Sequence, residues 1–477
     1  MIPRVQPTPI PSGPARPARP AAGQPRRIAP DVLEAVLPGP GRDRLAGGDV
    51  LVVTTGQQPG LFTGPLYTVH KALSAVALAA RLERERRVPV VPVFWVAGDD
   101  HDFAEGNHCA FLDAAGDAQR LTLRERAADA PQAPLFREPC GPEAARALDE
   151  LRTRTPESEF KAGVLEWLTA AYRADQNLAD AFAQAVAGLL GARGLAVFRA
   201  HAPSAKRAAA PWILKGLGVA LPDGLSPVLV EGRLGRDRLR PDGDAFVTRR
   251  GGERFTRAQI EALAASAPDR LSPNVLLRPA VEAALFPTVA YAAGPGELAY
   301  FPDVGPCYAA LGVTPQTPVP RWSGVLIESR VDKVLERFRV AVEDLKPPAG
   351  ALEGRIARDE LPAHVLELLT RLRDTLTVQY DALALAARAV DPTLERTVQS
   401  TRNQALGGTH EIEKKLVAAS KRAHETLTGQ IVRARAALFP LGTPQERTLT
   451  VASFLIRYGP ALLDELAREV ARWTDAL

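Results

Sequence analysis

The stretch from Val52 to His108 constrains the fold of this 477-residue chain more than any other. It begins with an apolar β-branched run that ends in a glycine-rich turn. A long amphipathic segment follows, and a second apolar run then leads into carboxylates and histidines. This pattern predicts strand, helix and buried strand, the opening unit of a parallel α/β sheet. Ligands of open α/β sheets bind beyond the carboxyl ends of the strands, so the polar segments mark the expected site.

The remaining segments predict a sheet core interrupted by insertions. Residues 1–27 are proline-rich and predict an extended arm, and the core is expected to span residues 28–322. Within the core, the alanine-rich stretch 141–192 predicts a helical insertion. Short segments at 226–257, separated by Pro-Asp-Gly-Asp and Gly-Gly, predict a small β-rich antiparallel insertion. Two further extended runs are expected to join the sheet: residues 194–200 and 287–293.

Residues 323–438 carry a helical pattern with a seven-residue repeat. One row is Leu369, Leu376, Leu383 and Val390, and the row after the Asp391-Pro392 break is Val398, Ala405, Ile412 and Ala419. Two such helices predict an antiparallel coiled-coil hairpin, although Gly407-Gly408 interrupts the pattern. Such an arm buries little against its own chain, so we expect a homodimer formed through it. Residues 439–477 predict a tail that packs back on the core.

Composition and charge argue against several classes of protein. The net charge of +4 is small for this length and forms no basic block, so no nucleic-acid partner is expected. No apolar stretch reaches bilayer length, and the N-terminus lacks the apolar region of a secretory signal, so no membrane association is expected. Cys109, Cys140 and Cys307 cannot all pair and lack zinc-finger spacing. Reduced thiols in a cytoplasmic protein are therefore expected.

The turn after the first strand is the first candidate ligand loop. It reads TGQQPGLFTG and leads into a helix, whose N-terminus favours anionic groups. It has neither the Lys-Ser/Thr of a Walker A loop nor the G-x-G-x-x-G spacing of dinucleotide folds. A tight turn would explain the glycines but not two glutamines and two threonines. The expected substrate-binding residues are Thr55, Gly56, Gln57, Gln58, Gly60, Gly64 and Tyr67.

The segment after the second strand gathers four carboxylates and two imidazoles within ten residues. We rank polar substrate binding first, acid–base catalysis by His101 tuned by Asp99 or Asp102 second, and a metal site third. A helix N-cap with solvated acids is the plain structural alternative. The predicted catalytic residues are His101, Asp99 and Asp102. The predicted substrate-binding residues are Asp100, Asn107 and His108.

Two further clusters complete the expected site. In LSPNVLLRP, Ser272 or Asn274 can cap the next helix, and Arg278 can bind a carboxylate or phosphate in a bidentate manner. Ser272, Asn274 and Arg278 are predicted substrate-binding residues. The turn AGPGELAY and a later extended run are two more candidate ligand loops. Their candidate residues are Gly294, Gly296, Glu297, Tyr300 and Arg321. We expect all these loops on one edge of one sheet.

The motifs together resemble a known family. TGQQPGLFTGPLYT, PVFWVAGDDHDF, LSPNVLLRP and AGPGELAYF are similar to segments of the cysteine-adding enzymes of bacillithiol biosynthesis, and the likeness covers almost the whole chain. The resemblance implies an α/β fold with a Rossmann-like core, connecting-peptide insertions and a coiled coil that promotes dimerisation. It also implies a cysteine ligase that joins L-cysteine to the amine of glucosaminyl-malate in the last step of bacillithiol synthesis. Amide formation in water requires carboxyl activation, so ATP is the expected cosubstrate. Under this resemblance the expected nucleotide-binding residues are Gly294, Gly296, Glu297, Tyr300 and Arg321.

The chain departs from the family pattern in three places. The His-x-Gly-His signature of nucleotidyltransferases is missing, and GQQPG stands in its place. Many relatives carry Gln-Asp where this chain has Glu282-Ala283. After the PGE motif they often carry Ala-Gln-Leu-Lys, whereas here Phe301 is followed by Pro302-Asp303-Val304-Gly305. Roles of that Gln and Lys are therefore not transferred.

Under the ligase hypothesis, the acidic segment holds the cysteine ammonium or sugar hydroxyls, and His101 assists proton transfer from the attacking amine. Arg278 or Arg321 meets malyl carboxylates or phosphates, and no tightly bound metal is expected. Two alternatives stay open. One is a metal-dependent hydrolase or nucleotidyltransferase of a small metabolite, with the acidic cluster as ligands. The other is a non-catalytic scaffold in which the coiled coil is the functional part.

Overall fold

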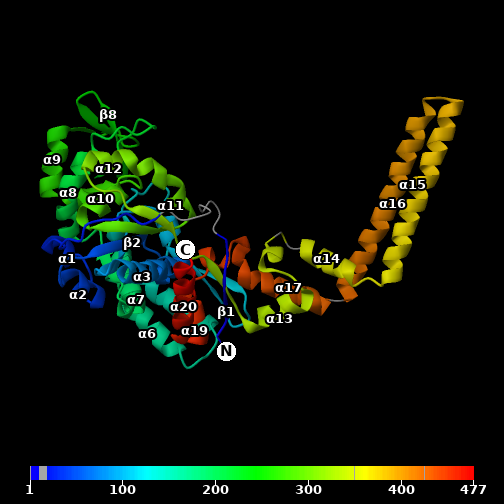
Figure 1. Ribbon diagram of the computed structural model, residues 1–477, viewed down its shortest axis with the longest axis horizontal. Helices are drawn as coiled ribbons and strands as arrows, with labels where there is room; N and C mark the ends of the chain where they lie inside the picture. Colours follow the sequence, from blue (N-terminus) through cyan, green and yellow to red (C-terminus); the bar gives the residue numbers. More distant parts are fainter. Residues whose placement is uncertain (1, 10–18, 347, 349, 424) are drawn as a thin grey trace. The chain divides into compact units, whose positions relative to one another are not determined.

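The computed structural model describes residues 2–9, 19–346, 348, 350–423 and 425–477 (Figure 1). The chain divides into two compact units: Met1–Ile327 together with Thr443–Leu477, and Glu328–Gly442. Both boundaries lie a few residues later than the heptad pattern indicated. Among the described residues, no helix has the length and apolarity needed to cross a bilayer.

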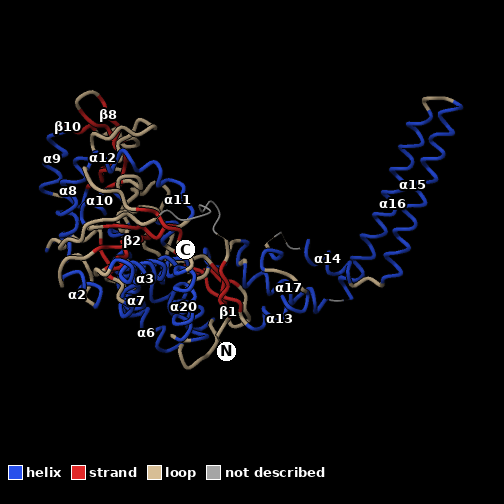
Figure 2. Tube along the Cα trace, in the orientation of Figure 1, coloured by secondary structure: helices blue, strands red, loops and turns tan. Residues whose placement is uncertain are grey.

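A five-stranded parallel sheet forms the centre of the first unit (Figure 2). Its order is β13-β12-β2-β3-β6, with β2 (Leu51–Gln57) in the middle. The other strands are β3 (Val90–Val96), β6 (Ala196–Arg199), β12 (Thr288–Ala293) and β13 (Thr317–Pro320). Every neighbouring pair runs parallel. The α/β class with a Rossmann-like sheet is therefore confirmed.

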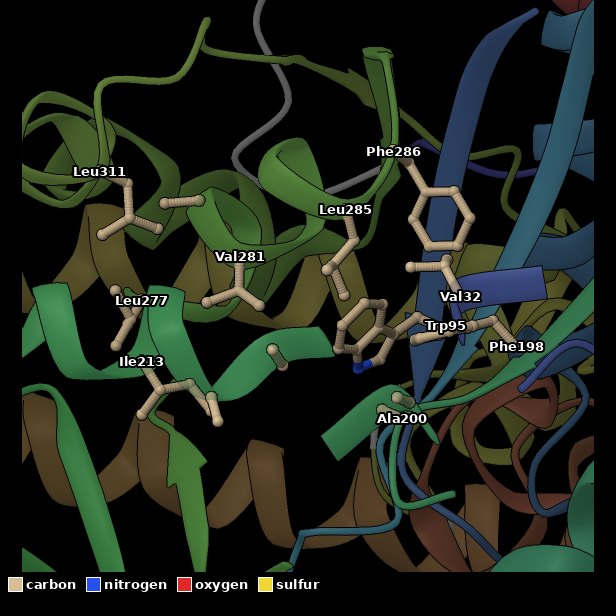
Figure 3. Close-up of a cluster of buried hydrophobic side chains, with 14 of the residues drawn as sticks. Val32, Trp95, Phe198, Ala200, Ile213, Leu277, Val281, Leu285, Phe286 and Leu311 are labelled. Carbon is tan, nitrogen blue, oxygen red and sulfur yellow. The ribbon is translucent and has the colours of Figure 1, made fainter. Parts of the chain in front are cut away.

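Both faces of this sheet are covered, because successive strand residues point to opposite sides. Val53 packs among apolar residues of α3 (Tyr67–Arg86), which joins β2 to β3. Val52 belongs to the larger cluster on the other face, which includes residues of α8 (Pro203–Gly216) and α10 (Arg278–Leu285). Figure 3 shows this cluster, in which the Trp95 and Phe198 rings lie 4.8 Å apart. The apolar runs of β2 and β3 follow from this two-sided burial.

A second, antiparallel sheet has the order β10-β9-β8-β7-β11. Its strands are β7 (Val228–Gly232), β8 (Gly235–Asp242), β9 (Ala245–Thr248), β10 (Arg254–Thr256) and β11 (Leu271–Pro273). The β-rich insertion thus extends beyond residue 257, across α9 (Arg257–Ser266), to include Ser272. Local pattern did not show this because β11 pairs with β7, about forty residues earlier, with Leu271 opposite Val230.

The helical insertion and the C-terminal tail share a core. Helices α5 (Glu143–Arg154), α6 (Lys161–Ala171) and α7 (Leu178–Leu190) pack with the hairpin β4 (His108–Leu112) and β5 (Ala118–Thr122). Ala452 and Ile456 of α19 (Val451–Tyr458) join this cluster. The last helix, α20 (Ala461–Asp475), packs against α3. The tail belongs to the first unit for this reason.

The proline-rich N-terminal segment is partly a strand, which the sequence did not predict. β1 (Arg4–Pro7) pairs antiparallel with β14 (Gly324–Ile327), with Arg4 opposite Ile327. Arg26 forms a bridge with Val50 beside the parallel sheet. Residues 10–18 of the predicted arm lie outside the described residues.

Short helices complete the first unit. They are α1 (Pro30–Glu34), α2 (Pro40–Ala46), α4 (Phe103–Gly106), α11 (Pro295–Tyr300), α12 (Gly305–Leu311) and α18 (Gln445–Thr448). The 3-10 turns of this unit are η1 (Leu61–Thr63), η2 (Leu135–Arg137), η3 (Gly191–Arg193), η4 (Pro268–Arg270) and η5 (Phe301–Val304).

The second unit is helical and contains the predicted hairpin. Its long helices are α15 (Ala363–Val390) and α16 (Leu394–Ala423), which lie side by side (Figure 1). They are accompanied by α13 (Ser329–Phe338), η6 (Val342–Leu345), α14 (Ala351–Asp359), α17 (Glu425–Leu438) and η7 (Pro440–Gly442). The coiled-coil hairpin is confirmed, and α16 continues through Gly407-Gly408. Three residues of the predicted rows, Leu383, Val390 and Ile412, are exposed, and so is Leu372 on the same hairpin, since one helix pair covers only one face of each helix.

Candidate active site

A cavity of about 450 Å³ opens beyond the carboxyl ends of β2 and β3. Gln57, His101 and Glu297 all line it, so the predicted loops meet in space. The lining residues are Gly56, Gln57, Gln58, Trp95, Ala97, Asp99, Asp100, His101, Leu229, Arg236, Arg238, Pro273, Asn274, Val275, Arg278, Tyr291, Glu297 and Tyr300. Both sheets contribute, so the expectation that every loop lies on one edge of one sheet is wrong for the Ser272–Asn274 segment.

The first loop contributes only its beginning to the cavity. A side chain at Gly56 would place Cβ 2.9 Å from the carbonyl oxygen of Trp95, so this close strand pairing requires glycine. The Thr55 hydroxyl donates instead to the Ala292 carbonyl (2.8 Å) within the sheet. The Gly60 carbonyl accepts from the Tyr172 hydroxyl (2.7 Å), a contact inside the helical insertion. Thr55 and Gly60 therefore fix the loop rather than meet a ligand.

The end of the loop and the start of α3 are also structural. Phe62, Thr63 and Gly64 all have positive φ, which reverses the chain before α3. Gly64 does not line the cavity, and neither does Tyr67, whose hydroxyl accepts from Gln57 Nε2 (3.1 Å). Gly56, Gln57 and Gln58 remain the ligand-facing part of the motif.

A buried ion pair joins the first loop to the α11 turn. Lys71 Nζ donates to the Gly56 carbonyl (2.5 Å), to Gln57 Oε1 (3.3 Å) and to Glu297 Oε1 (2.8 Å). Glu297 also accepts from the Tyr291 hydroxyl (2.5 Å) and the Gly294 N–H (2.7 Å). Burial opposes ionisation of Glu297, but Lys71 and Arg278 outweigh it and hold the pKa of this carboxyl below its usual value. Glu297 is thus an ionised part of the cavity wall.

The acidic segment divides into side chains with different environments. Asp99 lines the cavity and forms an ion pair with the buried Lys206 (2.5 Å). Asp100 lines the cavity, and its carboxylate accepts from the Asp102 N–H (3.0 Å). Asp102 caps α4 by accepting from the Glu105 N–H (3.0 Å) and does not line the cavity. For Asp102 the plain N-cap alternative was therefore the right one.

Asn107 and His108 lie away from the cavity. Asn107 is buried, and its Nδ2 donates to the Arg124 carbonyl (2.8 Å). His108 begins β4, and its Nδ1 lies 2.9 Å from the Ala104 carbonyl oxygen. Neither side chain lines the cavity, because the chain turns into the β4 hairpin after α4 and carries both with it, and their substrate contacts stay a prediction.

His101 lies next to an arginine that the sequence analysis missed. Arg236 Nη1 is 3.3 Å from His101 Nδ1. Arg236 Nε also donates to the Ser272 hydroxyl (2.8 Å), and Nη2 donates to the Pro273 carbonyl (2.8 Å). Burial and the Arg236 charge lower the pKa of His101 below 6.5, although Asp100 and Asp102 oppose the shift. The imidazole is therefore neutral near pH 7.

Arg278 is held at the cavity by two partners. It forms an ion pair with the fully buried Glu282, and its Nη2 donates to the Tyr300 hydroxyl (2.9 Å). Its guanidinium also lies over the Tyr291 ring, 5.1 Å from the centroid. Glu282, one of the departures from the family pattern, thus fixes the cation that the sequence predicted. Upstream, Asn274 Oδ1 accepts from the N–H groups of Leu276 (3.0 Å) and Leu277 (2.9 Å) and shapes the turn before α10.

The expected nucleotide-binding set is only partly at the cavity. Glu297 and Tyr300 line it, whereas Gly294 and Gly296 do not. Arg321 is 2% exposed and forms a two-pronged ion pair with Glu446 (2.9 and 2.7 Å). Arg321 therefore links β13 to the C-terminal tail and does not line the cavity at which a contact with phosphates or carboxylates was predicted.

Several cavity residues gave no signal in the sequence. Arg236 and Arg238 lie on β8, in a hairpin of the antiparallel sheet, and Trp95 and Tyr291 belong to apolar strand runs. Alternation along GRDRLR indicated only a strand with charged residues on it. That Arg236 and Arg238 line the same cavity as the loops of the parallel sheet was decided by pairing and packing between distant segments.

The carboxylates do not gather as metal ligands. Within the part of the chain that the structure describes, no group of three His, Cys, Asp or Glu side chains converges on one point. Asp99 turns to Lys206 and Asp102 to α4, which separates the residues of the predicted cluster. The donor set does not fit a resident metal ion.

Comparison with known sequences assigns the chain to a family. The sequence profile described as "Bacillithiol biosynthesis BshC, N-terminal Rossmann-like domain" matches residues 42–219 and 229–322, and the corresponding "C-terminal coiled-coil domain" matches residues 324–472. The chain belongs to the BshC family. The family resemblance predicted from the motifs is thus confirmed, and this BshC-family chain is an enzyme of the ligase class.

Curated BshC proteins align with most of the chain. The "putative cysteine ligase BshC" of Salinibacter ruber is 32% identical over 458 residues, covering 91% of this chain and 83% of that protein. The proteins of the same name from Heliobacterium modesticaldum and Prosthecochloris aestuarii are each 31% identical, covering 91% and 87% of this chain and 83% and 80% of their own lengths.

Proposed function

We propose that this chain is an ATP-dependent cysteine ligase that joins the carboxyl group of L-cysteine to the amine of glucosaminyl-malate, the last step of bacillithiol synthesis. One observation carries the proposal: a single cavity is lined both by carboxylates, Asp99 and Asp100, and by guanidinium groups, Arg236, Arg238 and Arg278. Both expected substrates combine cationic nitrogen with carboxylate. The volume of about 450 Å³ suits small metabolites.

The wall charges differ in how free they are to meet a substrate. Asp99 is ion-paired with Lys206, whereas the Asp100 carboxylate accepts from the Asp102 backbone N–H, so Asp100 is the preferred partner for an ammonium group. Arg238 already pairs with Asp223 (2.5 Å). Arg278 is oriented by Glu282 and Tyr300, and a planar guanidinium fixed in this way suits a substrate carboxylate.

Carboxyl activation is the role proposed for ATP. The Gly56–Gln58 segment and the Glu297–Tyr300 helix supply polar groups on neighbouring strand ends, where nucleotides and other ligands bind in α/β sheets. The negative charge of ionised Glu297 is balanced by Lys71 and Arg278. The carboxylate therefore does not prevent a polyphosphate from binding at this end of the cavity. The chain's own residues bind, orient and shield the reacting groups.

The test is a direct assay with glucosaminyl-malate, L-cysteine and ATP, analysed by mass spectrometry. We expect the amide product and stoichiometric conversion of ATP to AMP or ADP. The identity of the released nucleotide distinguishes an adenylate from an acyl phosphate. Asp100→Asn should raise the KM of the substrate whose ammonium group Asp100 binds. The same change at the exposed Asp129, Asp129→Asn, should leave both KM values unchanged. Absence of the amide with intact, folded protein would overturn the proposal.

We further propose a cytoplasmic homodimer formed through α15 and α16. Cys109, Cys140 and Cys307 are all free and buried, as suits a reducing compartment. Leu372, Leu383, Val390 and Ile412 are 43%, 53%, 82% and 49% exposed on the helical hairpin. Apolar side chains repeated along such a surface support contact with a second copy.

A further inference from the structure

The structure assigns His101 the role of a neutral hydrogen-bond donor: Arg236 fixes the proton on Nε2, and this N–H faces an oxygen atom of the bound ligand. The oxygen belongs to the carboxyl group being activated or to a phosphoryl group. This differs from the proton-accepting role that the sequence alone suggested. The catalytic part of the inference rests on the ligase function proposed above, whereas the tautomer itself does not.

The contact between Arg236 and His101 decides which nitrogen carries the proton. A guanidinium has N–H donors and no acceptor, so the only hydrogen bond open to the pair has His101 Nδ1 as acceptor. Nδ1 must then keep its lone pair, and the proton of a neutral imidazole resides on Nε2. A proton taken up at Nδ1 would face the Arg236 N–H at 3.3 Å and would be repelled.

Arg236 is itself held in place by the antiparallel sheet. Its Nε and Nη2 donate to Ser272 and to the Pro273 carbonyl, both on β11, so the guanidinium cannot swing away without losing two hydrogen bonds. The Arg236 carbonyl accepts from Arg250 Nη2 (2.6 Å), a further tie within this sheet. Ser272 therefore acts through Arg236, and both are positioning residues for the imidazole.

The backbone of His101 is fixed as well. Its carbonyl oxygen accepts from Arg126 Nη1 (3.0 Å) and from the Phe103 N–H (2.9 Å). Nε2 makes no hydrogen bond to any described residue and is not among their buried unpaired polar atoms, while the ring lines the cavity. One N–H donor on an otherwise anchored side chain is therefore left to a ligand.

The charges around His101 favour the neutral state at the pH of catalysis. Arg236 and Arg250 disfavour the imidazolium, and Asp100 and Asp102 favour it. Burial adds to the arginine effect, so the pKa lies below 6.5. A neutral N–H donor aimed at developing negative charge on oxygen is a common means of stabilising acyl and phosphoryl transfer.

Nitrogen-15 NMR of the histidine-labelled full-length protein tests the tautomer without any substrate. His101 is one of seven histidines, so its signals are assigned from their loss in the His101→Gln spectrum. We expect the Nε2–H tautomer at pH 7, persisting below pH 6.5. A protonated Nδ1, or an imidazolium at pH 7, would overturn the inference whatever the activity. Arg236→Met should move the His101 pKa upward; an unchanged pKa would remove Arg236 from the positioning role.

Two amide variants of His101 test the proposed catalytic role of its Nε2–H donor. The glutamine side-chain nitrogen reaches about as far as Nε2, whereas that of asparagine reaches only about as far as Nδ1. We expect His101→Gln to keep kcat within roughly tenfold of the parent, and His101→Asn to lose about 100-fold or more, the usual cost of one such donor. Equal losses, or an acid limb of the rate profile that vanishes in His101→Gln, would overturn the donor role.

Titration with single substrates identifies the oxygen. A shift of the Nε2–H signal on adding ATP alone indicates a phosphoryl acceptor, and a shift on adding L-cysteine alone indicates a carboxylate. Contact with the ligand is rejected if the signal shifts neither with ATP or L-cysteine alone nor with ATP, L-cysteine and glucosaminyl-malate together. Because the tautomer is read from the free protein, failure of the ligase assay and failure of this inference are distinguishable.

Discussion

Lys71 Nζ and the Glu297 carboxylate lie 2.8 Å apart, although the two residues are 226 positions apart in the sequence. Lys71 comes from α3 and also holds the carbonyl of Gly56, while Glu297 lies in the first turn of α11 and accepts from the Gly294 N–H. One ammonium group therefore keeps two ligand loops in register. Burying both charges is tolerable only because each is paired and hydrogen-bonded.

Lys71→Met should destabilise the first unit by about 3–5 kcal/mol, because it leaves the Glu297 carboxylate buried beside one cation fewer. Urea unfolding followed by circular dichroism measures the change. Exposed Arg84, paired with Asp475, supplies the control: Arg84→Met should cost at most about 1 kcal/mol. The double variant Lys71→Met/Glu297→Gln should recover part of the loss. Equal losses in Lys71→Met and Arg84→Met would contradict the buried pairing.

Glu282→Gln should loosen Arg278 and raise the KM for the carboxylate-bearing substrate by roughly tenfold, since a hydrogen bond to a charged group contributes about 1.5 kcal/mol. The value of kcat should change little, because the substrate binds less tightly in both ground and transition states. Steady-state kinetics with each substrate varied in turn provides the measurement. Exposed Glu261, matched as a helical glutamate that pairs with Arg257, gives the control variant Glu261→Gln. A fall in kcat at constant KM would argue against this role.

Acid should unfold the first unit partly through Glu446. Burial opposes its ionisation, but hydrogen bonds from His70 and Arg321 outweigh burial and hold its pKa below 4.5. A carboxyl whose folded pKa is depressed adds stability above its unfolded pKa, and this stability is lost as the pH falls below about 4.5. Unfolding free energies of the wild type and Glu446→Gln, measured between pH 7 and 3.5, should converge toward the acid end. Curves that stay parallel would refute the assignment.

The hairpin variant Leu372→Lys/Leu383→Lys should weaken the proposed dimer while leaving helix content unchanged, because both side chains are exposed within one copy. Sedimentation velocity gives the mass, and circular dichroism checks the helices. The polar variant Glu367→Lys/Arg371→Glu, on the same helix, reverses an exposed pair and should leave the mass unchanged. A wild type that sediments as a monomer would count against this surface. So would a Leu372→Lys/Leu383→Lys variant that sediments as the same dimer as the wild type.

Local sequence determined the framework of the molecule. Two-sided burial makes β2 and β3 continuous apolar runs, and glycine is required at position 56 because β2 approaches Trp95 of β3 closely there. These signals are periodic or local, so the parallel sheet, the helical hairpin and the placement of Gln57, His101 and Glu297 at one cavity could be predicted. Family membership followed from the same motifs.

Only the tertiary structure decided which polar side chains face the cavity. Arg236, on β8 of the antiparallel sheet, reaches His101, which follows β3 of the parallel sheet, and Arg321 is withdrawn from the cavity because Glu446 of the C-terminal tail pairs with it. Asp102 resembles its neighbours in sequence but caps α4. Each outcome depends on a partner distant in sequence or on the direction of one turn. Spacing along the chain carries no information about such long-range pairing, whereas it directly records the period of a strand or helix.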